Sequence, residues 1–142
     1  MLKNRFKKIL VSLDGSSNSI RALNEAISLA RQSNSELIGL FVVSTTSIFQ
    51  EKFKTFRNYE LRRGKKILEK AKLTSAKNGI DLQGEVLYDN NIIHAISKFA
   101  QFKKCNLIVM GFRWIDSPRE KFLGSKSHGV INISKIPVLI VK

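Results

Sequence analysis

The sequence predicts an α/β protein in which helices cover both faces of a doubly wound parallel sheet. Three observations carry this prediction: apolar runs without alternation, segments of helical periodicity between them, and turn residues at the junctions. Strands that are apolar on both sides belong in a sheet that is covered on both faces, and their alternation with helices is typical of parallel connections. The 142 residues fit one domain, 1–142, with no linker or repeat.

Five segments are the predicted strands. The runs at 8–14 and 36–43 are continuous and apolar, whereas 80–88 alternates between apolar and polar residues. The last two are 106–111 and 137–142. These runs alternate with helical segments, so the right-handed crossover rule leaves few topologies.

Four segments are the predicted helices. In the first, Ser16 or Ser17 is the N-cap and one face carries apolar residues; the second covers about 50–78, is weakened by Gly64 and ends at Gly79. The third follows the caps Asp89, Asn90 and Asn91, and the fourth follows an irregular loop at 112–123. The apolar faces are Ile20, Leu23, Ile27 and Ala30 in the first helix, Phe49, Phe53, Phe56, Ile67 and Ala71 in the second, and Ile92, Ile93, Ile96, Phe99 and Ala100 in the third.

The chain is strongly basic, with 25 Lys and Arg against 11 Asp and Glu, a net charge of +14. Half of this surplus lies in 51–78, with ten basic residues against three glutamates. Such a charge attracts phosphates and acidic surfaces, although a solvated helix face explains it equally simply. No apolar run is long enough to span a bilayer, so we expect no membrane partner. The single Cys105 forms neither an internal disulfide nor a metal cluster, and we expect a cytoplasmic protein.

Two strand ends carry residues suited to phosphate. Ligands of an open doubly wound sheet bind beyond the carboxyl ends of its strands. Asp14-Gly15-Ser16 follows the first predicted strand, and Gly111 ends the fourth. Glycine permits close backbone approach, and a helix N-terminus offers free N–H groups, so Gly124-Ser125-Lys126-Ser127 is a candidate phosphate site.

At these residues the chain resembles the universal stress protein family over essentially its whole length. The matching stretches are KKILVSLDGSSNSIRAL, NLIVMG and LGSKSHGVINISKIPVLIVK. In ATP-binding members the loop reads glycine, two residues, glycine, nine residues, glycine, then serine or threonine. Gly111, Gly124 and Ser125 keep that spacing, but Trp114 replaces the second glycine, and Ser12 stands where many members have proline.

The resemblance implies a Rossmann-like sheet of the adenine nucleotide alpha hydrolase-like type, with strand order 3-2-1-4-5. It places Asp14 and the backbone of Val42 beside adenine. Gly111 and Arg113 fall on the ribose and phosphate side. It also implies a homodimer formed through the last strand, Pro137–Lys142. The whole implied site is Ser12, Asp14, Val42, Gly111, Arg113, Gly124, Ser125 and Ser127.

Each of these residues also has a plain structural interpretation. Asp14 would cap the first helix or close the turn that follows it, and Val42 would be a core residue. Gly124 and Ser125 would be a turn and a helix cap. Trp114 would be either an apolar plug over the loop or a stacking surface for a base.

Nothing in the sequence defines a catalytic centre. His94 and His128 lack metal-ligand spacing, and no motif places Asp116 or Glu120 as a metal-holding acid. We therefore predict no enzyme, or at most weak ATP hydrolysis. Trp114 is expected to weaken the phosphate loop.

Three functions remain open. The first is a regulatory stress-response protein that binds ATP or a related adenine nucleotide, with or without Mg²⁺, and acts on protein clients that the sequence does not identify. The second is an interaction protein of the same fold that binds no nucleotide. The third is a basic surface for acidic partners or nucleic acid; nucleic-acid binding would be weak and electrostatic because the chain carries no recognition motif.

Overall fold

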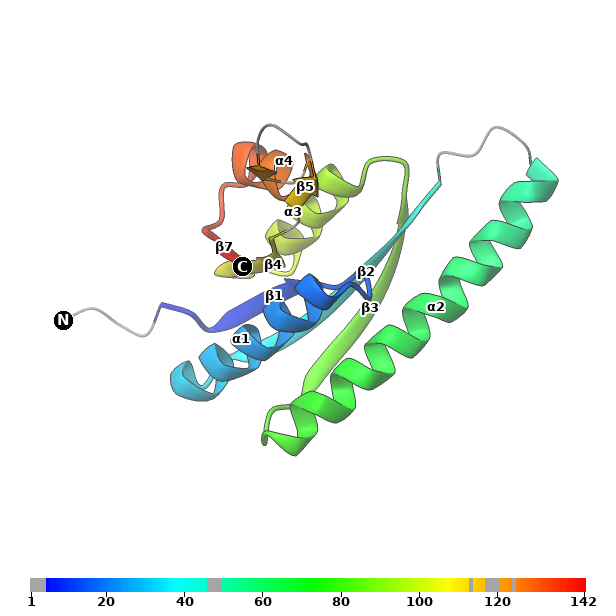
Figure 1. The fold of residues 1–142 in the computed structure, drawn as a ribbon. Helices are drawn as coiled ribbons and strands as arrows, with labels where there is room; N and C mark the ends of the chain where they lie inside the picture. Colours follow the sequence, from blue (N-terminus) through cyan, green and yellow to red (C-terminus); the bar gives the residue numbers. More distant parts are fainter. Residues whose placement is uncertain (1–4, 46–49, 113, 117–120, 124) are drawn as a thin grey trace.

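A computed structural model describes residues 5–45, 50–112, 114–116, 121–123 and 125–142, with the backbone alone given for 50–53, 114–116, 121–123 and 125. Its main sheet has five parallel strands in the order β3-β2-β1-β4-β7 (Figure 1). This is the predicted order 3-2-1-4-5, which is confirmed. The strands are β1 (Lys8–Ser12), β2 (Glu36–Ser44), β3 (Leu82–Asp89), β4 (Leu107–Gly111) and β7 (Val138–Val141).

The core has two halves, one on each face of the sheet. Ile9 and Val11 of β1 face α1 (Ser17–Ser33) and α2 (Gln50–Lys77), whereas Leu10 between them faces α3 (Ile92–Phe102) and α4 (Ser125–Ile133). Successive strand residues point to opposite faces. A strand that is buried on both sides must therefore be apolar at every position, which explains the continuous runs.

The first helix begins as predicted. Ser16 is its N-cap, and the Ser16 hydroxyl accepts a hydrogen bond from the backbone N–H of Ser19. Leu23, Ile27 and Ala30 of the predicted face are buried, but Ile20 is 52% exposed. The prediction that Ile20 is buried was wrong because this position lies at the margin of the apolar face, on the side of α1 that faces the space toward α2.

The glycine in α2 has a packing role that the sequence did not suggest. A Cβ at Gly64 would lie 2.4 Å from Cδ1 of Phe41 in β2, so only glycine lets the helix approach this ring. Ile67, Leu68 and Ala71 face the core, as helical spacing predicts. The N-terminal half of α2 extends past the sheet edge, and there Phe56 is 47% exposed rather than buried (Figure 1).

The opposite face is closed by α3 and α4. Asn91 caps α3 by accepting a hydrogen bond from the His94 backbone N–H, as one of the predicted caps. The two helices pack so closely that a Cβ at Gly129 would lie 2.4 Å from Cδ1 of Ile93. None of the helices in the described parts of the chain is long and apolar enough to cross a membrane.

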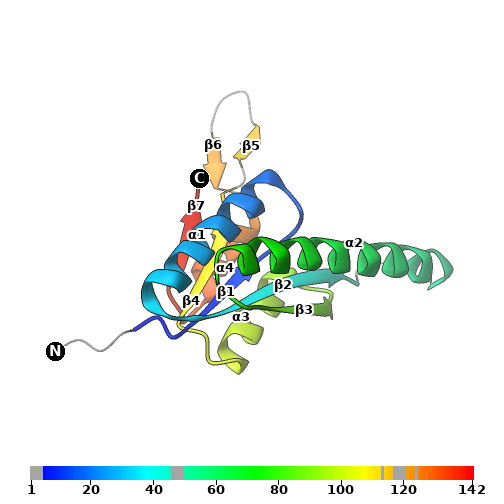
Figure 2. The ribbon, with the colours of Figure 1, turned by 90° about the horizontal axis from the view of Figure 1, so that it is seen from below.

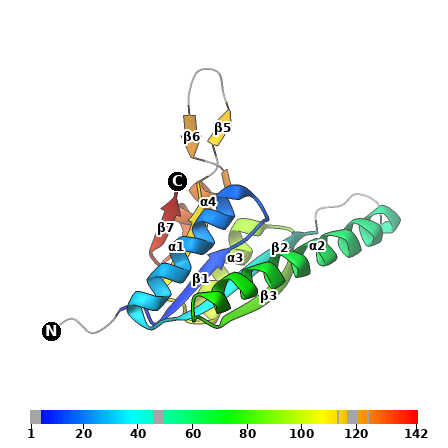
Figure 3. The same ribbon diagram turned by 60° about the horizontal axis from the view of Figure 1, so that its bottom comes forward.

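The segment predicted as an irregular loop contains a hairpin. β5 (Trp114–Asp116) pairs antiparallel with β6 (Lys121–Leu123), and Trp114 stands opposite Leu123. Figures 2 and 3 show this small sheet beyond the ends of β4 and β7. The two strands are short, and the sequence between them lacks a two-residue turn signal, so the hairpin could not be predicted from the sequence. Trp114 has extended strand backbone, in which tryptophan costs no left-handed strain.

Candidate functional site

A cleft of about 240 Å³ lies at the carboxyl ends of β1, β2 and β4. The chain leaves β1 toward α1 and leaves β4 toward the hairpin and α4, so consecutive connections depart to opposite faces and leave the cleft between them. This is where doubly wound sheets bind ligands. The position of the cleft therefore follows from the strand order.

Five of the eight predicted site residues line this cleft: Ser12, Asp14, Val42, Gly111 and Ser127. They come from β1, the turn after it, β2, β4 and α4, and are brought together only by the fold. Arg113 and Gly124 lie outside the described residues. Ser125 begins α4, and its side chain is not among those described.

The Asp14 carboxylate organises the turn between β1 and α1. Its Oδ1 accepts a 2.9 Å hydrogen bond from the backbone N–H of Ser16, and Gly15 has a left-handed φ of 83°. Burial would raise the pKa of Asp14. The hydrogen bonds from Ser16 and Ser19 and the charge of Lys126 outweigh this effect and hold the pKa below its ordinary value of 3.8. The cleft therefore contains a carboxylate that is ionised at neutral pH.

The fold itself requires glycine at position 111, whether or not a ligand binds. A Cβ at this position would lie 2.5 Å from the backbone carbon and oxygen of Asn18, in the first turn of α1. The Gly111 carbonyl accepts a 3.1 Å hydrogen bond from the buried Ser127 hydroxyl. Gly111 thus joins the end of β4 to both α1 and α4.

The wall formed by α2 was missed by sequence reasoning. Phe56, Glu60 and Arg63 line the cleft, and their spacing of four and three residues places them on one face of the helix. Arg63 donates a 2.9 Å hydrogen bond to the Asp14 carbonyl, which lies 49 positions away in the sequence. No local signal predicts a contact at that separation.

Arg63 is held on three sides. Its guanidinium pairs with both carboxylate oxygens of Glu60, at 3.1 and 3.2 Å, and lies 5.2 Å from the centroid of the Phe41 ring. The hydrogen bond to Glu60 raises the pKa of Arg63 above its ordinary value. Arg63 is a fixed positive group that links α2, β2 and the turn after β1.

The two ends of the cleft differ in chemistry. Toward β2, α2 and α3 the lining is mostly apolar, with Phe41, Val42, Phe56 and Ile92 beside the Glu60–Arg63 pair, whereas toward α4 it includes Asn18, Lys126 and Ser127. The second end also has the N-terminus of α4, whose free N–H groups favour anions. The cleft is suited to a ligand with an apolar ring and an anionic tail.

The described residues hold no other chemical centre of note. They contain no group of three or more His, Cys, Asp or Glu that could hold a metal ion, and His94 and His128 are exposed. Burial raises the pKa of the Cys105 thiol to about 11, so this cysteine is a neutral core residue at physiological pH.

Comparison with known proteins identifies the family. The family model described as the universal stress protein family matches residues 5–142. The chain is 39% identical to universal stress protein YxiE of Bacillus subtilis, over 96% of this chain and 99% of YxiE. The chain belongs to the universal stress protein family.

Solved structures agree on the fold. Universal stress protein UspA from Lactobacillus plantarum superposes with a TM-score of 0.87 at 24% identity, covering 97% of this chain and 99% of that one. A universal stress protein in complex with cAMP superposes with a TM-score of 0.79 at 24% identity, covering 97% of this chain and 98% of that one. The universal stress protein from Archaeoglobus fulgidus in complex with dAMP superposes with a TM-score of 0.74 at 21% identity, covering 97% of this chain and 99% of that one. Adenine nucleotides are therefore ligands of this fold in other proteins of the family.

Proposed function

We propose that this protein binds ATP or a related adenine nucleotide in the cleft and acts as a regulatory stress-response protein. The observation that carries the proposal is the convergence of Ser12, Asp14, Val42, Gly111 and Ser127 on one cleft, which has a mostly apolar end and an end that carries Lys126 and the N-terminus of α4. The family relatives solved with cAMP and dAMP support the same class of ligand. We propose that its output is a change in shape or in partner binding rather than turnover.

The two ends of the cleft set the orientation of the nucleotide. The base lies toward Val42 and Asp14, among the apolar residues of β2, α2 and α3. The phosphates lie toward Gly111, Ser127 and Lys126, at the N-terminus of α4. Arg113, Gly124 and Ser125 complete the phosphate side through the family resemblance, with Mg²⁺ as a companion of the phosphates.

Calorimetric titration tests this assignment. We expect ATP to bind more tightly than GTP, and Asp14→Ala to weaken ATP more than inorganic phosphate. Each titration is run with and without magnesium. Nucleotide released when the purified protein is denatured identifies the natural ligand. GTP binding as tight as ATP binding would remove the base assignment.

Trp114 makes the site a weak one under this proposal. The family glycine at this position is replaced by tryptophan, and only glycine leaves room for the backbone to approach a phosphate closely. Trp114→Gly should tighten the binding of ATP, and Gly124→Val should abolish it. A thermal shift reports both, since ligand at about 100 times its dissociation constant stabilises by roughly 2.7 kcal/mol. If ATP stabilises neither the wild type nor Trp114→Gly, the protein is instead an interaction protein with a closed site.

The proposal includes a homodimer formed through β7. This strand is an edge of the main sheet, and Leu139 in it is 37% exposed. An apolar edge strand is a ready pairing surface. Leu139→Lys should shift the mass measured by light scattering from dimer to monomer, whereas an unchanged dimer would place the interface elsewhere.

A further inference from the structure

A second concave surface lies between α1 and α2, on the face of the sheet opposite α3 and α4. The two helices stand on different strands: α1 packs on β1 and β4, whereas α2 packs on β2 and β3 (Figures 1 and 3). Two adjoining cavities of about 230 and 220 Å³ fill the space between them and share Asn24. We call this surface the α1–α2 groove.

The groove is straight and about as long as three helical turns. One wall runs from Ile20 to Arg31 in α1, and the other runs from Ile67 in α2 to Asn78, the residue that follows this helix. Each wall covers a span of about 16 Å at 1.5 Å per residue. Both helices follow parallel strands and run in the same direction, so the groove is a shallow channel between two neighbouring helices.

The floor of the groove is apolar. Leu13, Leu23 and Ile27 are buried beneath it, with Ile67 and Ala71 on the α2 side. Ile20 stands at its edge with 52% of its surface exposed, and this is the residue whose burial was wrongly predicted. Ile20 therefore extends the apolar lining of the hollow to the protein surface.

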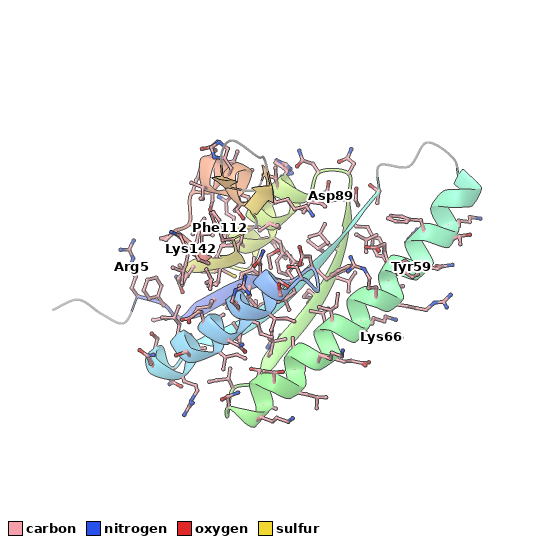
Figure 4. All side chains as sticks on the ribbon, viewed as in Figure 1. Arg5, Tyr59, Lys66, Asp89, Phe112 and Lys142 are labelled. Carbon is pink, nitrogen blue, oxygen red and sulfur yellow. The ribbon has the colours of Figure 1, made fainter. Side chains whose placement is uncertain are left out.

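The rim of the groove is cationic. Its lining residues include Lys70 and Arg31 but no carboxylate. Lys66, Lys70, Leu73 and Lys77 follow one another at helical spacing along the same side of α2, all exposed, and Leu73 is 64% exposed. Figure 4 marks Lys66 on this helix. Glu69 lies about 100° around the helix from Lys70, toward Lys65 and Lys72.

We propose that the α1–α2 groove docks an acidic amphipathic helix of a partner protein. Apolar side chains at helical spacing would enter the floor, and flanking carboxylates would meet Lys66, Lys70 and Arg31. The net charge of +14 favours an acidic partner at this surface, and the second copy of this chain in the proposed dimer lies at β7 instead. The proposal does not require nucleotide binding, so the two can be tested separately.

A designed peptide provides the probe. It has roughly 18 residues, long enough to form a helix, with leucines on one face and glutamates on the flanks. Fluorescence anisotropy at about 0.15 M salt reports its binding, and a shuffled peptide of the same composition is the control. We expect micromolar binding of the amphipathic peptide and at least tenfold weaker binding of the shuffled one.

Paired charge reversals locate the contact. The double variant Lys66→Glu with Lys70→Glu should weaken peptide binding about tenfold. The control variant, Lys65→Glu with Lys72→Glu, makes the same change in net charge on the other flank of α2 and should have little effect on the affinity. Ile20→Glu should abolish binding, with Phe102→Glu as an exposed control on α3. Circular dichroism confirms that each variant is folded.

Three results would overturn the proposal. The first is the absence of amphipathic-peptide binding to the wild type, and the second is equal loss in both charge-reversal pairs. The third is binding of phosphatidylglycerol vesicles or of a single-stranded oligonucleotide that is lost in Lys66→Glu with Lys70→Glu while the peptide does not bind. That outcome would assign the groove to a lipid surface or a nucleic acid.

Discussion

The two ends of the cleft are built in different ways. At the β4 end, Gly111 is pressed against the backbone of Asn18 and accepts a hydrogen bond from Ser127, so backbone meets backbone. At the α2 end, Gly64 is pressed against the Phe41 ring, and the Arg63 side chain donates a hydrogen bond to the Asp14 carbonyl. The contacts that hold α2 to the rest of the cleft are therefore made by side chains. Backbone cannot rotate away from a clash, whereas a ring or a guanidinium can shift. The β4 end is therefore the rigid end and the α2 end the adjustable one.

Gly111→Ala should have the largest effect. The added methyl group would lie 2.5 Å from the Asn18 backbone, so α1 or β4 must move. We expect a loss of about 3 kcal/mol in the free energy of unfolding, the upper part of the range for overpacking. Urea unfolding measures it. A loss smaller than that of Gly64→Ala would reverse the assignment of the rigid end.

Gly64→Ala should cost less, about 2 kcal/mol, because the Phe41 ring can give way and alanine improves helix propensity by about 1 kcal/mol. Combining it with Phe41→Leu tests the cause. The double variant should be more stable than the sum of the two single losses predicts, since the smaller side chain makes room for the methyl group. Strict additivity would show that the ring is not the obstacle.

Arg63→Ala should cost about 1 kcal/mol, since the side chain is partly exposed and its hydrogen bond to the Asp14 carbonyl has a charged donor. Arg62→Ala is the matched control on the exposed side of the same helix and should leave stability within about 0.5 kcal/mol of wild type. The difference in urea midpoint between the two variants measures the link from α2 to the β1 turn. Equal midpoints would remove that link.

The smallest effect concerns Asp14, which lies between the two ends. Its pKa is lowered in the folded protein, so its contribution to stability is present above pH 3.8 and is lost as the pH falls through the folded value. An NMR titration should find the carboxyl pKa below 3.8. Asp14→Asn should flatten the acid limb of the stability curve, and a folded pKa above 3.8 would contradict the turn geometry.

The sequence predicted the layers and the caps because these depend on short-range patterns, and short-range patterns also pointed to Asp14, Gly111 and Ser127 in the cleft, whereas Ser12 and Val42 came from the family resemblance. Ser16 and Asn91 cap helices through contacts within three residues, and the strand order came with the family resemblance. The α2 wall could not be predicted, since Arg63 and Asp14 meet only after two crossovers. The predicted burial of Phe56 and Ile20 was wrong for a related reason: periodicity identifies the apolar side of a helix but not which of its residues a strand or neighbouring helix covers.

The turn after β1 has a consequence for communication within the molecule. Leu13 and Ser19 line both the cleft and the α1–α2 groove, so one short segment is the common wall of two binding surfaces. If a ligand on one side favours one arrangement of this wall, it changes the free energy of binding on the other side, and thermodynamics requires the effect to be equal in both directions. A nucleotide in the cleft and a helix in the groove would therefore act as allosteric effectors of one another across a single turn of chain.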